Sequence, residues 1–196
     1  MDIGLSARPL TDAEAGAGGA AVEYGRTRLV MAVGAGTRVS DLTLAELVDI
    51  YAGTRLTWSD GSKLRLVLRQ LADSNSEALK ELSPALRQAV VSADKRPGLV
   101  MAINDQEAAD QIEKVPGAIG PSSLAQILAE RRAMKALALN GVVPSAQTIA
   151  EGSYPLYKTM HLVTGPRTGD EARAFIVFVQ SAAGRALLAQ TGHWVK

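Results

Sequence analysis

The stretch LRLVLRQLADSNSEAL, Leu64 to Leu79, predicts a buried apolar strand, then a small polar cluster, then a helix. The polar cluster contains Ser74, Asn75 and Ser76. A helix N-terminus points its free N–H groups and the positive end of its dipole at one place, so this order predicts a small-anion cradle. Arg69, just upstream, adds a two-pronged donor suited to an oxyanion. The plainer alternative is that Ser74 or Asn75 only caps the helix and that Arg69 is a surface charge.

The composition is that of an ordinary globular chain that can bury a core without metals or disulfides. Its 196 residues are 47% hydrophobic and 21% charged, and the absence of cysteine excludes disulfides, thiol catalysis and cysteine–zinc sites. A net charge of +1 and an aromatic content of 4% argue against nucleic-acid binding, which needs a basic face and stacking platforms. No apolar run is long enough to predict a membrane span, and no signal peptide is recognised.

Strands and helices alternate along the whole chain, and this alternation predicts an α/β fold. Strands are expected at residues 2–6, 24–33, 64–68, 98–103, 118–120, 135–139 and 157–164. Helices are expected after caps at Thr11, Thr43, the 74–76 cluster, Ser83, Asn104 and Ser122 or Ser123, and again at 145–151 and 171–188. Gly184 is expected to interrupt the last of these helices.

No catalytic or metal-binding pattern is recognised in the sequence. His161 and His193 are the only histidines, and neither belongs to a metal-like pair. His161 is expected to be structural or half-exposed in its strand. Asp2, Asp105 and Glu107 are acidic, but nothing in the sequence pairs them as acid and base. The sequence therefore predicts a protein that is not an enzyme and holds no metal or cofactor.

Three segments, taken in order, carry a family resemblance. The first is DIGLSARPL at residues 2–10. The second is LVMAV at 29–33 followed by TLAELVDIYAG at 43–53 and Trp58-Ser59-Asp60. The third is Asn104-Asp105 with IEKVPGAIG at 112–120. Together they resemble the phosphate-binding type of solute-binding protein of ABC importers, which has the type II periplasmic fold.

The resemblance implies two α/β lobes joined by crossing strands, with the ligand in the cleft between them. Residues 1–33 and 156–196 would form lobe one, and residues 34–155 would form lobe two. The family's first strand, phosphate loop and helix have no counterpart in this sequence. The chain therefore resembles an N-terminally truncated member whose first lobe is incomplete.

The resemblance also implies the ligand-binding residues. They would be Ser6 and Arg8 from lobe one, and Arg69, Ser74, Asn75 and Ser76 from lobe two. Two departures affect this site. Ala7 stands where the family has an acidic residue that accepts a hydrogen bond from protonated phosphate. The 73–76 segment lacks the two glycines of the family's loop, so its backbone approaches an anion less readily.

The leading hypothesis is a periplasmic solute-binding module that closes around a small oxyanion such as phosphate and delivers it to an ABC permease. The alternative is a sensory or protein-interaction domain that keeps the fold but has lost the pocket. An enzyme on the same scaffold is a weaker hypothesis, because no titratable pair is recognised. An incomplete lobe would expose sheet edge and apolar helix surface, so a homodimer that covers the gap is expected.

Overall fold

The computed structural model describes residues 3–195 and confirms the α/β class; Asp2, expected in the first strand, lies outside the described residues. The strands are β1 (Gly4–Ser6), β2 (Ala20–Gly34), β3 (Asp41–Leu42), β4 (Arg65–Arg69), β5 (Val100–Ala102), β6 (Ala118–Ser123), β7 (Met134–Ala136), β8 (Ala138–Leu139), β9 (Tyr157–Thr164) and β10 (His193–Trp194). The helices are α1 (Asp12–Gly16), α2 (Leu44–Ala52), α3 (Ser74–Leu82), α4 (Pro84–Asp94), α5 (Asp105–Lys114), α6 (Leu124–Ala129), α7 (Ala146–Ala150), α8 (Asp170–Gln180) and α9 (Ala182–Gln190).

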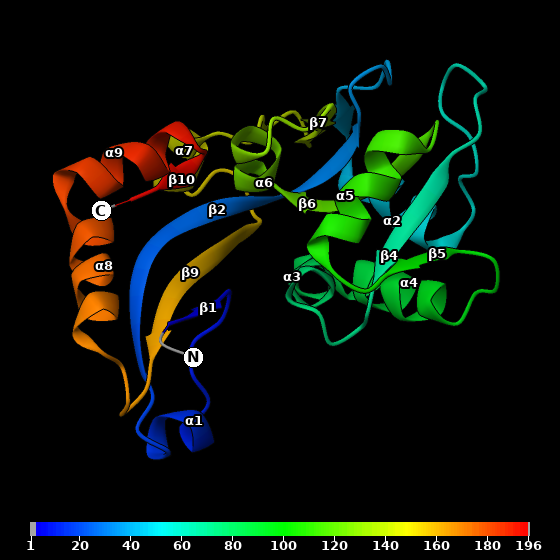
Figure 1. Cartoon of the computed structure of the whole chain (residues 1–196). Coiled ribbons are helices and arrows are strands. Elements are labelled where there is room, and N and C mark those ends of the chain that lie inside the picture. Colours follow the sequence, from blue (N-terminus) through cyan, green and yellow to red (C-terminus); the bar gives the residue numbers. More distant parts are fainter. Residues whose placement is uncertain (1–2, 196) are drawn as a thin grey trace.

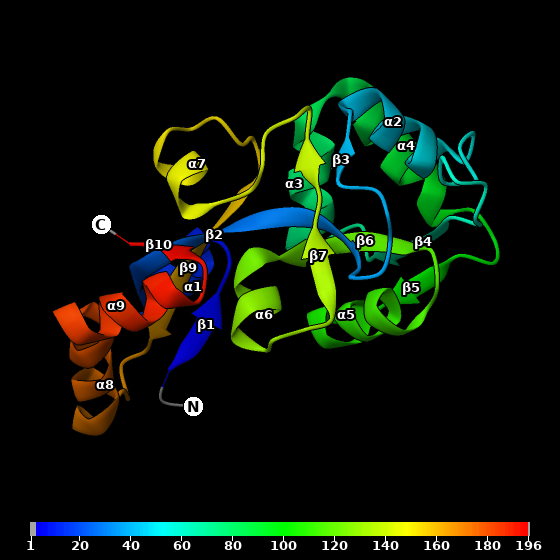
Figure 2. The same cartoon turned by 90° about the horizontal axis from the view of Figure 1, so that it is seen from above.

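The fold is organised around β2, a strand of 15 residues. Its first part, residues 20–28, pairs antiparallel with β9, and its last part, residues 29–34, pairs antiparallel with β6 and β7. The resulting sheet has the order β1-β9-β2-β6-β4-β5. Figure 1 shows β2 passing from the group that contains β1, β9 and α8 to the group that contains β4, β5 and α2 to α5. One continuous strand therefore joins the two halves of the molecule, and Figure 2 shows the same connection from above.

Strands β4, β5 and β6 run parallel, with Val67 opposite Val100 and Leu66 opposite Ile119. After β4 ends at Arg69 the chain enters α3, and after β5 ends at Ala102 it enters α5. Because parallel strands bring their carboxyl ends to one edge of a sheet, the N-termini of α3 and α5 lie at the same edge.

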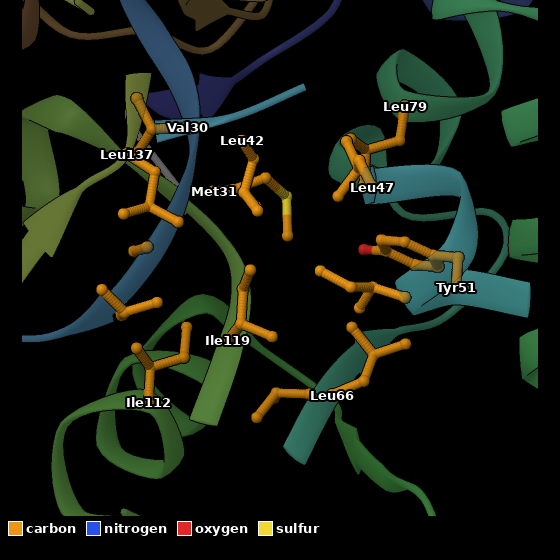
Figure 3. Packing of buried hydrophobic residues seen from close by; sticks show 14 of the residues in the cluster. Val30, Met31, Leu42, Leu47, Tyr51, Leu66, Leu79, Ile112, Ile119 and Leu137 are labelled. Atoms are coloured by element: carbon orange, nitrogen blue, oxygen red, sulfur yellow. The ribbon is translucent and has the colours of Figure 1, made fainter. Parts of the chain in front are cut away.

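The hydrophobic core lies where the second half of β2 meets β4, β6 and the surrounding helices. In Figure 3, Met31 of β2, Ile119 of β6 and Leu66 of β4 face side chains from the helices. Leu47 of α2 and Ile112 of α5 are fully buried there. A buried core on this side holds the three parallel strands and their following helices in place.

Local capping residues start several of the helices where the sequence predicts. Thr43 accepts a hydrogen bond from Glu46 N, and the Glu46 side chain bonds back to Thr43 N, which completes a capping box before α2. Asn104 caps α5 and Ser123 caps α6, and each side chain accepts a hydrogen bond from one backbone N–H of its helix. The structure confirms these helix starts. They could be predicted because a cap depends only on residues close in sequence.

The sequence predicts a helix at 171–188 that is interrupted at Gly184. The position of the interruption is wrong, because the chain bends at Ser181 and forms α8 and α9. Ser181 is extended, and its hydroxyl accepts from Gly184 N and donates to Phe178 O. A Cβ on Gly184 would lie 2.3 Å from Phe178 O. Gly184 therefore allows the two helices to approach closely and does not itself mark the break.

No single helix among residues 3–195 has the length and apolar composition to cross a membrane. Only α8 and α9 taken together, with their 67° bend, pass on length and composition.

Gly117 lies in the turn between α5 and β6, and a substitution there tests how closely the neighbouring backbone is packed. It has a φ of +75°, and an added Cβ would lie 2.0 Å from Lys63 O. Gly61 has a similar φ of +81°, but nothing lies within 4 Å of an added Cβ. We expect Gly117→Ala to lower the free energy of unfolding by about 3 kcal/mol, and Gly61→Ala by about 1 kcal/mol. Urea unfolding measures both, and equal losses would show that the close contact with Lys63 is unimportant.

Candidate functional site

A cavity of about 1210 Å³ opens between the two halves of the molecule. One wall consists of β1, the turn that follows it and the first half of β9. The opposite wall is one face of α3, beginning at its N-terminus. Figure 1 shows β1 and β9 on one side of this space and α3 on the other. We call this cavity the cleft.

Ser6 and Arg8 lie in the cleft wall, within the turn after β1. The Ser6 hydroxyl donates to Arg8 O at 2.8 Å and accepts from Arg8 N at 3.2 Å. The Arg8 guanidinium donates to both carboxylate oxygens of Glu14 at 2.8 Å each. Hydrogen bonds from Arg8 and from Thr11 hold the pKa of Glu14 at about 2. Arg8 therefore faces the cleft as one half of an exposed ion pair.

Ser74 is the first residue of α3 and lines the cleft. The cap of this helix is Asp73, whose Oδ1 accepts from Asn75 N at 2.9 Å. Neither Ser74 nor Asn75 is the cap, which corrects the simpler interpretation of the sequence. The Asp73 carboxylate stabilises the positive end of the helix dipole and already occupies one of its N–H donors.

Arg69 is buried, with 6% of its side chain exposed, so it is not a surface charge. Its Nη2 lies 2.7 Å from Asp73 Oδ2 and 3.4 Å from Asp105 Oδ1. Its Nη1 donates to Ala102 O at 3.1 Å. The guanidinium thus joins the ends of β4 and β5 to the first residues of α3 and α5.

Asn75 and Ser76 are also buried, with 1% and 4% of their surface exposed. Asn75 Nδ2 donates to Asp105 Oδ1 at 3.0 Å, and Ser76 Oγ donates to Arg69 O at 3.1 Å. Of the six expected residues, the structure brings Ser6, Arg8 and Ser74 to the cleft surface. It places Arg69, Asn75 and Ser76 behind that surface, where they hold the start of α3 in position.

Three kinds of residue in the cleft wall were not expected from the sequence. Lys158 of β9 lines the cleft with 8% of its side chain exposed, and its Nζ lies 3.9 Å from Asp105 Oδ2. Burial lowers the pKa of Lys158, while the nearby Asp105 and Asp73 raise it. His161 also lines the cleft, half-buried as expected, and Glu77 and Glu81 do so from α3. Lys158 shares one face of β9 with Met160 and Leu162, and a lysine on such an apolar face is the signal that could have identified it.

No group of three or more His, Asp or Glu side chains within residues 3–195 is placed to hold a metal ion. The polar groups of the cleft are hydroxyls, a helix N-terminus and charged side chains. Such groups bind small polar ligands by hydrogen bonds and charge.

Two halves joined by a continuous strand, with a cleft between them, are an architecture that can close around a ligand by bending at the connection. A family model described as a PBP superfamily domain matches residues 1–183. The chain therefore belongs to this family of periplasmic-binding-protein-like domains, as its sequence resemblance predicted.

Individual relatives agree with this assignment. The phosphate-binding protein PstS of Bacillus subtilis is 23% identical over 159 residues, which cover 78% of this chain and 49% of the relative. This chain therefore spans about half the length of that curated relative. A Clostridium perfringens protein solved with bound phosphate has a TM-score of 0.79 at 20% identity, covering all of this chain and 79% of that one. An ABC-type phosphate transport receptor from Vibrio cholerae has a TM-score of 0.62 at 20% identity, with coverages of 100% and 80%. At these identities the structural matches establish the fold.

Asp73 allows a test of the buried charges at the start of α3. We expect Asp73→Asn, which keeps the cap but loses the charge beside Arg69, to cost about 2 kcal/mol of unfolding free energy. Asp73→Ala loses the cap as well and should cost about 3 kcal/mol.

Glu77→Gln, which removes a more exposed ion pair on the same helix, serves as the control and should cost under about 1 kcal/mol. Denaturant unfolding of the three variants measures these losses. If Asp73→Asn costs no more than the control, the Arg69 cluster does not stabilise the fold.

Proposed function

We propose that this chain binds a small oxyanion, phosphate or a close analogue, in the cleft and serves as the solute receptor of an ABC importer. The observation that carries the proposal is the cleft itself. A nine-residue helix begins at its wall with a hydroxyl residue, Ser74, and faces a wall of strands from the other half. Helix N-termini and hydroxyl donors are groups that bind oxyanions.

Membership of the family supports a binding role and argues for a receptor rather than an enzyme. The names of the relatives support phosphate as the ligand, because the Bacillus subtilis protein is a phosphate-binding protein and the Vibrio cholerae protein is a phosphate transport receptor. The periplasm as the site of action and an ABC permease as the partner follow from the same relationship and are part of the proposal.

We propose residues 1–33 with 156–196 as lobe one and residues 34–155 as lobe two, with the end of β2, residues 29–33, reaching into the sheet of lobe two. Closure would bend the molecule where β2 exchanges its partner β9 for β6, between Arg28 and Leu29. The ligand would then be enclosed between the strands of one lobe and α3 of the other.

The expected site residues take two roles in this proposal. Ser6, Arg8 and Ser74 would contact the ligand from the two walls. Arg69, Asn75 and Ser76 would support the N-terminus of α3 from behind, through the hydrogen bonds that they make with Ala102, Asp105 and each other. Ligand contacts that are held by a second layer of hydrogen bonds keep their geometry better.

Calorimetric titration with phosphate, sulfate, molybdate and tungstate tests the proposed function. We expect heat of binding with at least phosphate, and we expect Ser74→Ala to weaken that binding about tenfold because a hydrogen bond to a charged ligand is lost. Ser59→Ala, in an exposed turn away from the cleft, is the control and should leave the affinity unchanged. Absence of heat with all four anions, in protein shown to be folded, would refute the proposal.

We also propose that two copies associate through α8. Phe175, Val177 and Phe178 on this helix are 50%, 68% and 47% exposed, which is typical of an interaction surface rather than of a solvated face. We expect sedimentation velocity to show a dimer that dissociates on dilution, and Phe178→Asp to shift it to monomer. A wild-type chain that is monomeric throughout the dilution series would contradict this.

A further inference from the structure

Arg69, the cation that the family resemblance assigns to the ligand, is already bound to protein oxygens through both of its Nη atoms. Both Nη atoms contact protein oxygens, from Asp73, Asp105 and the Ala102 carbonyl. Its Nε is buried and finds no acceptor among residues 3–195. A ligand could reach this guanidinium only by displacing Asp73 or Asp105, and such buried pairs are costly to separate.

Arg8, the other expected cation, is engaged too. Its guanidinium makes a two-pronged bond to Glu14, and 55% of its side chain is exposed to solvent. Its charge is therefore both neutralised by a neighbour and screened by water.

Lys158 differs from Arg69 and Arg8 in its contacts. Its side chain enters the cleft from β9 and is only 8% exposed, yet its Nζ makes no hydrogen bond within the described part of the chain. The nearest carboxylate oxygen, on Asp105, is 3.9 Å away, which is an ion-pair contact but beyond hydrogen-bond length. An ammonium group has three donors, and in the open cleft these donors face either solvent or a ligand. An oxyanion in the cleft would supply acceptors for them.

The position of Lys158 also suits a ligand that bridges the walls. It lies on the strand wall and shares the cleft with Ser74, which lies at the N-terminus of α3 on the opposite wall. Asp105 and Asp73 lie near it on the α5 and α3 side, together with Arg69. An oxyanion between Lys158 and Ser74 would contact both halves of the molecule at once.

The charged groups around Lys158 limit the negative charge that a ligand can carry. Arg69 and Lys158 supply two positive charges, and Asp73 and Asp105 supply two negative ones, so the cluster is neutral before any ligand binds. Glu77 and Glu81 add further carboxylates to the same α3 wall. In a partly buried site each additional negative charge meets stronger repulsion than it would in water.

We infer that Lys158 also contacts the bound ligand, and that the ligand is an oxyanion carrying a single negative charge. This inference rests on the proposed function and adds to it a contact residue and a charge class. The volume of the cleft, about 1210 Å³, also leaves space for an organic substituent on the oxyanion, as in a phosphate diester.

The contact is tested by calorimetry with inorganic phosphate on the wild-type chain and on Lys158→Met, which keeps the side-chain length and removes the charge. We expect the variant to bind about 10- to 100-fold more weakly, as for the loss of a hydrogen bond to a charged group. Lys114→Met removes an exposed lysine of α5 and is the matched control, with no expected change in affinity. Equal affinities of wild type and Lys158→Met would overturn the inference and leave the proposed function standing.

A second readout is independent of whether Lys158→Met folds. In the wild-type protein, the Lys158 side-chain NMR resonances should shift on addition of phosphate, while those of Lys114 stay in place. Absence of a Lys158 shift at saturating phosphate would overturn the assigned contact.

The charge class is tested at pH 8 with monomethyl phosphate, which is then doubly charged, and dimethyl phosphate, which is singly charged. Tighter binding of the diester supports the inference. Equal or tighter binding of the monoester, or no binding of the diester, overturns the charge assignment. A wild-type chain that binds neither ester nor inorganic phosphate would overturn this inference, whereas the proposed function would fall only if sulfate, molybdate and tungstate gave no heat either.

Discussion

The buried guanidinium of Arg69 is the interaction on which the arrangement of the site depends. Removing a guanidinium from water costs several kcal/mol, so it is stable at this place only with its acceptors around it. Those acceptors come from Asp73 before α3, Asp105 at the start of α5 and the Ala102 carbonyl at the end of β5. One side chain therefore holds two helix N-termini at the carboxyl edge of the parallel strands. The position of Ser74 in the cleft wall is a consequence of this cluster.

A second buried cation, Arg28, fixes the strand that joins the two halves. It is completely buried in β2, where its Nη1 donates to Tyr154 O at 2.6 Å and its guanidinium lies 5.0 Å from the Tyr154 ring. Burial lowers the pKa of Arg28 to about 10, far enough above neutrality to keep the charge. The segment before β9 is thus attached to β2 at the point where β2 changes partners. Any closing motion must bend β2 near a residue that is itself held on several sides.

The sequence predicted what depends on neighbours in the chain and missed what depends on distant contacts. Caps such as Thr43 and Asn104 were predictable because their hydrogen bonds reach only three residues ahead. The strand-to-helix transition at Arg69 was predictable for the same reason. The burial of Arg69 depends on Ala102 and Asp105, and the position of Lys158 depends on how β9 lies across the cleft from α3 and close to Asp105 of α5. Pattern and propensity contain no information about such pairings, so the distinction between supporting and ligand-facing residues required the structure.

The segment Asp73-Ser74-Asn75-Ser76, which contains no glycine, explains why the charges are distributed in this way. A glycine loop leaves backbone N–H groups open to an anion, whereas the Asp73 carboxylate here accepts from Asn75 N and pairs with Arg69. The helix N-terminus and the arginine thereby neutralise a side chain of the protein instead of a ligand. Ser74 remains on the cleft surface from this segment, and the ammonium of Lys158 lies across the cleft on β9. In the proposed site, the groups left to bind an anion therefore come from the strand wall as well as from the start of α3.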